Sequence, residues 1–116
     1  MVVVIPYWIT GPSLLPGGFT SADMVIGLFN GSKTEVATSG LGIVDVRDLA
    51  KCHVEAVRKP EAANQRFCCH SGEISYWKEI ADWLDGEFGP QGYTVTTQEA
   101  AGERVKMARL SNQKAR

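Results

Sequence analysis

The sequence has no apolar run long enough to cross a membrane and no cysteine framework. Its opening stretch, Val2–Ile5, is short, lacks a basic lead and meets Pro6 at once, which excludes a signal peptide and a membrane span. The three cysteines are an odd number without the spacing of a disulfide scaffold, so a secreted disulfide-rich protein is excluded. We therefore expect a cytoplasmic protein with reduced thiols and no membrane contact.

The sequence also lacks an excess of charge of one sign. The formal net charge of the 116 residues is −1, so no overall field attracts nucleic acid or a membrane surface. Residues 102–116 hold five basic side chains and one acidic one, and we interpret this stretch as a solvated surface rather than a phosphate contact. With 44% hydrophobic and 22% charged residues, the composition fits one globular domain or a large piece of one.

A glycine motif stands in the wrong context for cofactor binding. Gly86 to Gly92 spells Gly-x-x-Gly-x-x-Gly, but a dinucleotide fingerprint follows a strand and opens a helix. Here the glycines follow a predicted helix and lead into a predicted strand, so the motif indicates a helix stop and a turn.

A metal site is not favoured either. The possible donors fall in two groups, Cys52-His53 and Cys68-Cys69-His70. Adjacent residues point to opposite faces of a strand and lie about 100° apart on a helix, so neither group converges on one ion. We expect no metal ion, with Cys68 and Cys69 as small core hydrophobes and His53 as a core histidine.

The remaining pattern alternates strands with helices, which predicts the α/β class. Apolar or β-branched runs predict strands at residues 2–5, 41–44, 67–69 and 93–97. Helices are predicted after the N-caps Ser21, Asp45 and Ser75. The predicted stops are Gly31 for the first, Pro60 for the second, and Gly86 with Gly89 for the third. The apolar face of the second helix is predicted to comprise Leu49, Ala50, His53, Ala56 and Val57.

The first strand has the pattern of an interior strand of a parallel sheet. Val2–Ile5 is β-branched without polar alternation, which is typical of a strand buried on both faces. Such a strand needs parallel neighbours reached through crossovers, and no residues before it supply them. We therefore expect the chain to begin in the middle of a fold.

Three segments together resemble the C-terminal half of the extended short-chain dehydrogenases/reductases, within the NAD-dependent epimerase/dehydratase superfamily. They read Ile-Pro-Tyr-Trp-Ile-Thr-Gly-Pro at 5–12, Val-Asp-Val-Arg-Asp-Leu-Ala-Lys-Cys-His at 44–53, and Arg-Phe-Cys-Cys at 66–69. The second segment is most similar to the branch of cinnamoyl-CoA and dihydroflavonol reductases. The resemblance covers most of residues 2–85 and is weak beyond them.

This resemblance implies that residues 1–116 are the C-terminal, substrate-side part of such an enzyme, without its front half. The implied fold is a partial Rossmann type, with one or two strands of the parallel sheet plus the small substrate-binding lobe. The implied activity of the whole enzyme is reduction of an aldehyde or ketone, or the reverse, with NADP or NAD as cofactor and a small carbonyl compound as substrate.

The resemblance also implies cofactor contacts. Pro6 and the backbone of Ile9 would border the nicotinamide carboxamide, at the carboxyl end of a parallel strand where such sheets bind ligands. Thr20 and Ser21 would offer hydroxyls and a helix N-terminus to the pyrophosphate, although plain helix capping is the favoured role of Ser21.

Substrate contacts are implied for two aromatic residues. Tyr7 and Trp8 would flank the substrate pocket of the whole enzyme, and ordinary packing in a loop stays an equal alternative for both.

The catalytic pair of the family does not occur in this sequence. The family uses Tyr-x-x-x-Lys, in which the lysine lowers the pKa of the tyrosine acid. Here the positions four residues after Tyr7, Tyr76 and Tyr93 are occupied by Gly11, Ile80 and Thr97. We therefore expect no catalytic residue in this chain and no tight cofactor binding by the chain alone.

Three alternatives stay open from the sequence. In the first, the chain is a stand-alone, non-catalytic binding module. In the second, it is a truncated gene product without function. In the third, it is one part of an enzyme that is completed by a partner chain carrying the N-terminal half. Cooperative unfolding would favour the first, and aggregation through exposed apolar surface the second.

Overall fold

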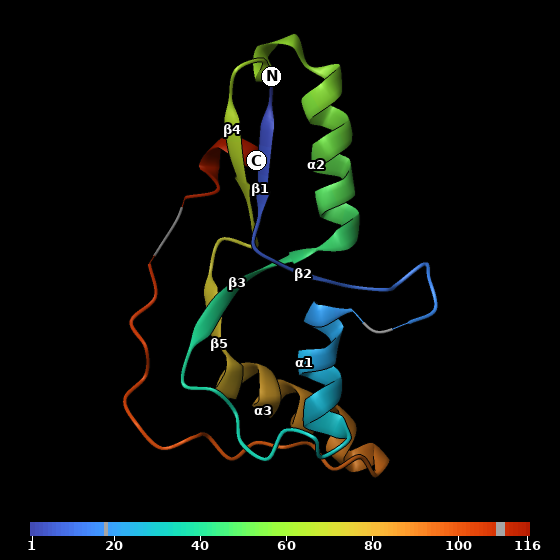
Figure 1. Cartoon of the computed structure of the whole chain (residues 1–116), viewed down its shortest axis with the longest axis vertical. Coiled ribbons are helices and arrows are strands. Elements are labelled where there is room, and N and C mark those ends of the chain that lie inside the picture. Colours follow the sequence, from blue (N-terminus) through green and yellow to red (C-terminus); the bar gives the residue numbers. More distant parts are fainter. Residues whose placement is uncertain (18, 109–110) are drawn as a thin grey trace. The chain divides into compact units, whose positions relative to one another are not determined.

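The computed structural model describes residues 1–17, 19–108 and 111–116. Helices are interspersed among the strands, two pairs of which are parallel, and this confirms the predicted α/β class (Figure 1). The strands are β1 (Val3–Pro6), β2 (Trp8–Thr10), β3 (Gly40–Asp45), β4 (Arg66–Cys69) and β5 (Ile74–Tyr76). The α-helices are α1 (Thr20–Phe29), α2 (Val46–Arg58) and α3 (Trp77–Phe88), with short 3-10 turns at Pro60–Ala62, Gly89–Gln91 and Gln113–Ala115. No helix in this described part of the chain has the length and apolar character needed to span a bilayer.

The chain forms two compact units, which are described separately. The first unit comprises residues 1–15, 42–74 and 108–116, and the second comprises residues 16–41 and 75–107.

The first unit is built on parallel strand pairs. Strand β1 pairs with β4 from Val3↔Arg66 to Pro6↔Cys69, and α2 packs on β1 and β2 (Figure 1). The core centres on Val44, Leu49 and Cys69, with Val4, Ile9, Cys52, Phe67 and Ala115 packed against it. This arrangement satisfies the rule that parallel strands are joined through a crossover rather than a hairpin.

The first strand differs from its prediction in burial. It begins at Val3 rather than Val2, and Val3, Val4 and Ile5 are half-buried instead of buried. Among the described residues β4 is the one sheet neighbour of β1, and α2 packs against β1. The other edge of β1 therefore presents backbone groups without a strand partner among these residues.

A single extended segment serves two sheets. The pairing of β1 with β4 ends before Tyr7, and the chain continues as β2. Strand β2 pairs in parallel with β3 from Trp8↔Ile43 to Thr10↔Asp45. The Tyr7 N–H still donates to the Cys69 carbonyl over 3.2 Å. Segment 3–10 therefore crosses from one parallel partner to another at the point where β1 ends.

The second unit holds α1, α3 and the extended segment that follows α3. The rings of Phe29, Phe88 and Tyr93 meet edge to face, with centroids 5.5 to 5.9 Å apart. Val36, only 2% exposed, donates its N–H to the Gln98 carbonyl over 2.7 Å. The predicted strand at 93–97 is wrong, because none of these residues belongs to a strand. An isolated bridge, between Val36 and Glu99, lies just beyond them.

Two of the three predicted helix caps are wrong. Helix α1 begins at Thr20 with Phe19 as N-cap, so Ser21 is already helical. Ser75 lies within β5, and α3 begins two residues later, where the Glu79 carboxylate accepts a hydrogen bond from the Tyr76 N–H over 2.9 Å. Gly86 does not stop α3, which continues to Phe88 and has Gly89 as its C-cap, so only the second of the two predicted glycine stops is confirmed. The roughly 1 kcal/mol that glycine costs in a helix is not enough to end α3 at Gly86.

The apolar face of α2 is only partly as predicted. Leu49 is buried in the core, as expected. However, Val57 is 84% exposed, and His53 is an exposed residue whose ring Nδ1 lies 2.8 Å from the Leu49 carbonyl oxygen. His53 is therefore not a core histidine, and the buried side of the helix runs through Leu49 and Cys52 instead.

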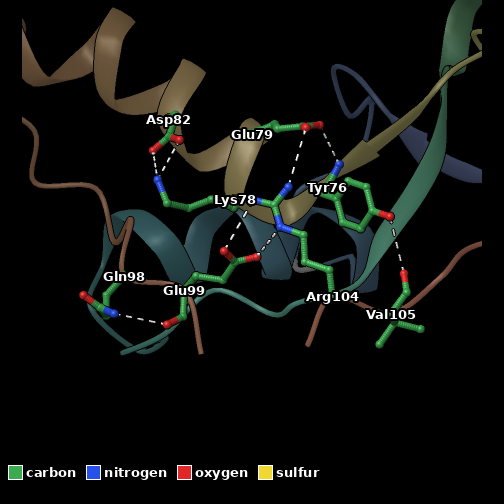
Figure 2. Close-up of polar contacts among 8 residues, drawn as sticks. All are labelled: Tyr76, Lys78, Glu79, Asp82, Gln98, Glu99, Arg104 and Val105. Carbon is green, nitrogen blue, oxygen red and sulfur yellow. Dashed lines mark hydrogen bonds and ion pairs between the residues drawn. The ribbon is translucent and has the colours of Figure 1, made fainter. Parts of the chain in front are cut away.

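Arg104 connects the segment that follows α3, residues 99–105, to the start of that helix. Figure 2 shows the Arg104 guanidinium directed at the carboxylates of Glu99 and Glu79, 3.0 and 4.0 Å away. Its central carbon also lies 4.9 Å from the centroid of the Tyr76 ring. The pKa of Arg104 is raised, chiefly by the hydrogen bond to Glu99. One side chain thus holds residues 99–105 against the first turn of α3.

We expect the substitution Arg104→Ala to lower the melting temperature by a few degrees. The ion pairs are solvent-exposed and contribute little each, but the cation over the Tyr76 ring is lost with them. Thermal unfolding followed by circular dichroism measures the shift. Lys106→Ala removes an exposed cation from the same segment and serves as the control, and equal shifts for the two variants would contradict the assigned role.

Candidate functional site

The candidate site lies where β1 and β4 end. Pro6, the last residue of β1, is exposed, and Tyr7, Trp8 and Ile9 follow it as half-buried residues of the first unit. Ligands of parallel α/β sheets bind beyond the carboxyl ends of the strands. Four of the six sequence-predicted site residues, which are consecutive in the chain, thus lie at this strand end.

The Tyr7 side chain is fixed by two neighbours distant in sequence. Its ring meets the His70 ring with centroids 5.1 Å apart and planes at 60°. A Cβ atom on Gly42 would lie 3.0 Å from two atoms of the Tyr7 ring and 3.4 Å from the His70 Cβ. The missing side chain of Gly42 therefore makes the space in which Tyr7 packs.

His70 is a site residue that the sequence interpretation missed. Its Nδ1 accepts a hydrogen bond from the Gly72 N–H over 3.1 Å, so in the neutral ring Nε2 carries the proton. This buried Nε2 has no hydrogen-bond partner among the residues that the structure describes, which is rare for a buried polar atom. His70 directly follows β4, and its place at the end of a predicted parallel strand is the signal that marks it as a candidate.

The remaining two predicted residues lie in the second unit. Thr20 is the exposed first residue of α1, and Ser21 is half-buried behind it. The N-cap residue, Phe19, has no side chain that accepts a hydrogen bond from the first turn. The first-turn N–H groups of α1 are therefore not occupied by an N-cap side chain, and such groups favour an anion.

Asp45 fixes the start of α2 beside the end of β2, as predicted for an N-cap. Its Oδ1 accepts a hydrogen bond from the Arg47 N–H over 2.8 Å, and its carboxylate pairs with the Arg47 guanidinium at 2.6 Å. The side-chain hydrogen bond from Arg47 lowers the pKa of Asp45 to about 2. Gly11 directly follows β2 and has a φ of +125°. A Cβ atom at this position would lie 2.9 Å from a Val46 methyl carbon, so a larger residue does not fit here.

The charge of Asp45 is expected to make stability depend on pH. Its pKa is depressed from an ordinary value of about 3.9 to about 2, so the gain is present above the ordinary value and is lost as pH falls through about 2. Asp45→Asn keeps an acceptor for the Arg47 N–H but removes the charge. We expect its melting temperature to be below that of the wild type at about pH 7, with the difference shrinking from about pH 4 to about pH 2.

Circular dichroism melts across this range measure the effect. Arg47→Ala removes the partner that depresses the pKa, so the same Asp45→Asn change should cost much less in that background. If the difference in melting temperature between wild type and Asp45→Asn stays constant down to about pH 2, the charge of Asp45 does not stabilise the fold as assigned.

A cavity in the first unit does not coincide with the predicted residues. It measures about 400 Å³ and lies against α2, with a lining that includes Lys51, Cys52, Glu55, Phe67 and Lys114. In the second unit a cavity of about 230 Å³ is lined by residues such as Leu28, Val36 and Trp77. Within residues 1–17, 19–108 and 111–116 no three His, Cys, Asp or Glu side chains are arranged to hold a metal ion.

Comparison with curated proteins finds reductases. The chain is 34% identical over 89 residues to tetraketide alpha-pyrone reductase 1 of Arabidopsis thaliana. The aligned region covers 76% of the chain and 27% of that protein. It is 27% identical over 114 residues to cinnamoyl-CoA reductase 1 of Petunia hybrida, covering 98% of the chain and 34% of the relative. The chain thus spans roughly a quarter to a third of the length of these relatives. No protein-family model matches it.

Comparison with solved structures finds the same kind of fold. Vestitone reductase from alfalfa superposes with a TM-score of 0.74 at 20% identity, over 97% of the chain and 36% of the reductase. The yeast methylglyoxal/isovaleraldehyde reductase in complex with NADPH superposes with a TM-score of 0.73 at 22% identity, over 98% of the chain and 38% of the enzyme. At these identities the likeness establishes the fold of the part that is covered.

Proposed function

Because the chain belongs to the extended short-chain dehydrogenases/reductases, we propose that it supplies part of an NADPH-dependent reductase that acts on the carbonyl group of an aldehyde or ketone. One observation carries the proposal: Pro6 ends β1, and Tyr7, Trp8 and Ile9 follow directly as the segment that passes from the parallel partner β4 to the parallel partner β3. The names of the relatives support the reaction class, and the position at a strand end supports the proposed place of the site.

In the proposed enzyme, Pro6 and the backbone of Ile9 border the nicotinamide ring. Pro6 is exposed at the end of β1, whereas Ile9 is anchored by packing against the core of the first unit. An exposed rigid residue followed by an anchored one forms a firm edge for a flat ring. Pre-organisation of this kind reduces the entropy lost when a cofactor binds.

The pyrophosphate is proposed to bind at the start of α1, through Thr20 and Ser21. This end of the helix carries a partial positive charge, and no N-cap side chain occupies its first-turn N–H groups. The acidic residue in that turn, Asp23, is exposed.

Tyr7 and Trp8 are proposed as walls of the substrate pocket. The Tyr7 ring is held between Gly42 and His70, so it presents a fixed apolar surface. When bound, the nicotinamide supplies hydride to the carbonyl carbon. The residues of this chain position the substrate, and the proton donor comes from elsewhere, because no tyrosine here is followed by lysine at the fourth position.

A complementing chain that carries the N-terminal half is the proposed partner. Among the described residues β1 has a sheet neighbour on one edge only, and a further parallel strand would pair with its other edge. Such a partner would bring the Tyr-x-x-x-Lys pair and the phosphate-binding glycines that this sequence lacks.

The test is reconstitution with the N-terminal two-thirds of a cinnamoyl-CoA reductase. Titration of NADPH against tryptophan fluorescence should show no saturable change for the chain alone below millimolar concentration. The mixture should bind NADPH saturably and oxidise it in the presence of an aromatic aldehyde, at a rate that the front half alone does not reach. A mixture that neither binds nor oxidises NADPH would refute the proposal.

Two matched tryptophan variants locate the substrate wall in the reconstituted enzyme. Trp8→Ala should raise KM for the aldehyde by roughly tenfold with a smaller effect on kcat, as loss of a binding contact does. Trp83→Ala, at an exposed tryptophan of α3, should leave both constants unchanged. Equal effects of the two variants would remove Trp8 from the pocket.

A further inference from the structure

Two cysteines from different elements meet inside the first unit. Cys52 lies on α2 and Cys69 ends β4, and their sulfur atoms are 3.0 Å apart although both thiols are free. A disulfide bond measures about 2.05 Å, so the sulfurs need to approach by about 1 Å. The two residues are separated by 17 positions, so the contact arises from the fold and not from neighbouring places in the chain.

The two thiols differ in accessibility. Cys69 is only 5% exposed and belongs to the core with Val44 and Leu49, and burial raises the pKa of its thiol to about 12. Cys52 is half-buried, and it lines the cavity of about 400 Å³ against α2. A small molecule that enters this cavity therefore reaches Cys52 first, while Cys69 stays protonated behind it.

The third cysteine has a different place. Cys68 precedes Cys69 in β4, and successive side chains of a strand point to opposite faces of the sheet. Cys52 contacts the Cys69 sulfur from the α2 side, and no such contact of Cys68 is present in the described part of the chain. Cys68 thus serves as an internal control.

We propose that Cys52 and Cys69 form a site of reversible oxidation, at which a small-molecule disulfide such as glutathione disulfide converts the two thiols into one intramolecular disulfide. The Cys52 thiolate attacks one glutathione sulfur, a Cys52–glutathione bond forms, and the first glutathione leaves as a thiolate. The Cys69 sulfur, on losing its proton, then attacks the Cys52 sulfur and releases the second glutathione. The cysteines lose two electrons and two protons, and the glutathione disulfide becomes two thiols.

The new bond would act near the candidate site. It would tie α2 to β4 at Cys69, whose carbonyl accepts the hydrogen bond from the Tyr7 N–H. It would also close a loop that the reduced chain leaves open, and cross-links of this length stabilise proteins mainly by restricting the unfolded chain. We expect the oxidised chain to melt on the order of 10 °C higher than the reduced chain, and dithiothreitol to reverse the shift.

The experiment treats the full chain with glutathione disulfide, alkylates the remaining thiols and measures intact and tryptic masses. The expected product has lost two hydrogens, carries one alkylated cysteine, and yields peptide 52–58 linked to peptide 67–78. Because peptide 67–78 contains both Cys68 and Cys69, the decisive sample is Cys68→Ser, in which the same link can come only from Cys69.

Other products would overturn the proposal. A bond between Cys68 and Cys69, a glutathione that stays attached to the wild type, or a link that disappears in Cys68→Ser each excludes the pair. Cys52→Ser and Cys69→Ser should both abolish the link. If either variant fails to fold, the wild type and Cys68→Ser decide the question without it.

Discussion

Replacing Trp77 with alanine is expected to lower the free energy of unfolding by about 4 kcal/mol, the typical cost of deleting a buried aromatic side chain. Trp77 is 7% exposed at the start of α3, and its N–H donates to the Ser39 carbonyl over 3.1 Å. It also lines the cavity of about 230 Å³ with Leu28 and Val36, so truncation enlarges an existing void. Because the side chains around Trp77 already leave a void unfilled, we do not expect them to move into the space that the deleted ring leaves.

Trp83, on the same helix, provides the control. It is 63% exposed, so Trp83→Ala should change the free energy of unfolding by no more than about 0.5 kcal/mol. Urea unfolding followed by circular dichroism measures both variants. If Trp77→Ala leaves too little folded protein to measure, Trp77→Phe and Trp83→Phe form a milder pair, and the first should still cost clearly more. Equal costs would mean that α3 does not pack as described.

Local chemistry accounts for the elements that the sequence predicts well. A β-branched or apolar run between turn residues is sufficient for β1, β3 and β4, and an aspartate before an amphipathic run is sufficient for the cap at Asp45. The failures lie where distant residues decide. Ser75 is a good cap by type, but the pairing of Ile74–Tyr76 as a strand takes it out of the helix. Residues 93–97 favour a strand, yet only a bridge at Glu99 forms in the part of the chain that is described.

The candidate site could be predicted only in part for the same reason. The segment Pro6–Ile9 can be found from the sequence because it follows a predicted buried strand. Its neighbours cannot, because Gly42 and His70 come from β3 and from the end of β4, and the packing of Tyr7 between them depends on how three strands align. A contact between residues far apart in the sequence leaves no periodic signal.

The periodic pattern of apolar residues predicts the buried face of helix α2 only in part, and the difference leads to a prediction for Leu49 and Val57. Leu49 and Val57 were both predicted on its apolar face, but Leu49 is 7% exposed and Val57 is 84% exposed. Apolar residues occur on more than one side of this helix, and the sequence pattern alone does not say which side the sheet covers.

Leu49→Ala is therefore expected to lower the free energy of unfolding by about 3 kcal/mol, whereas Val57→Ala should cost less than about 0.5 kcal/mol. Leu49 packs with Val44 and Cys69 at the centre of the first unit, so its truncation leaves a cavity between α2 and the strands. Urea unfolding of both variants under reducing conditions measures the difference. Equal destabilisation of the two variants would mean that Val57 is packed as closely as Leu49, which its exposed position in the structure contradicts.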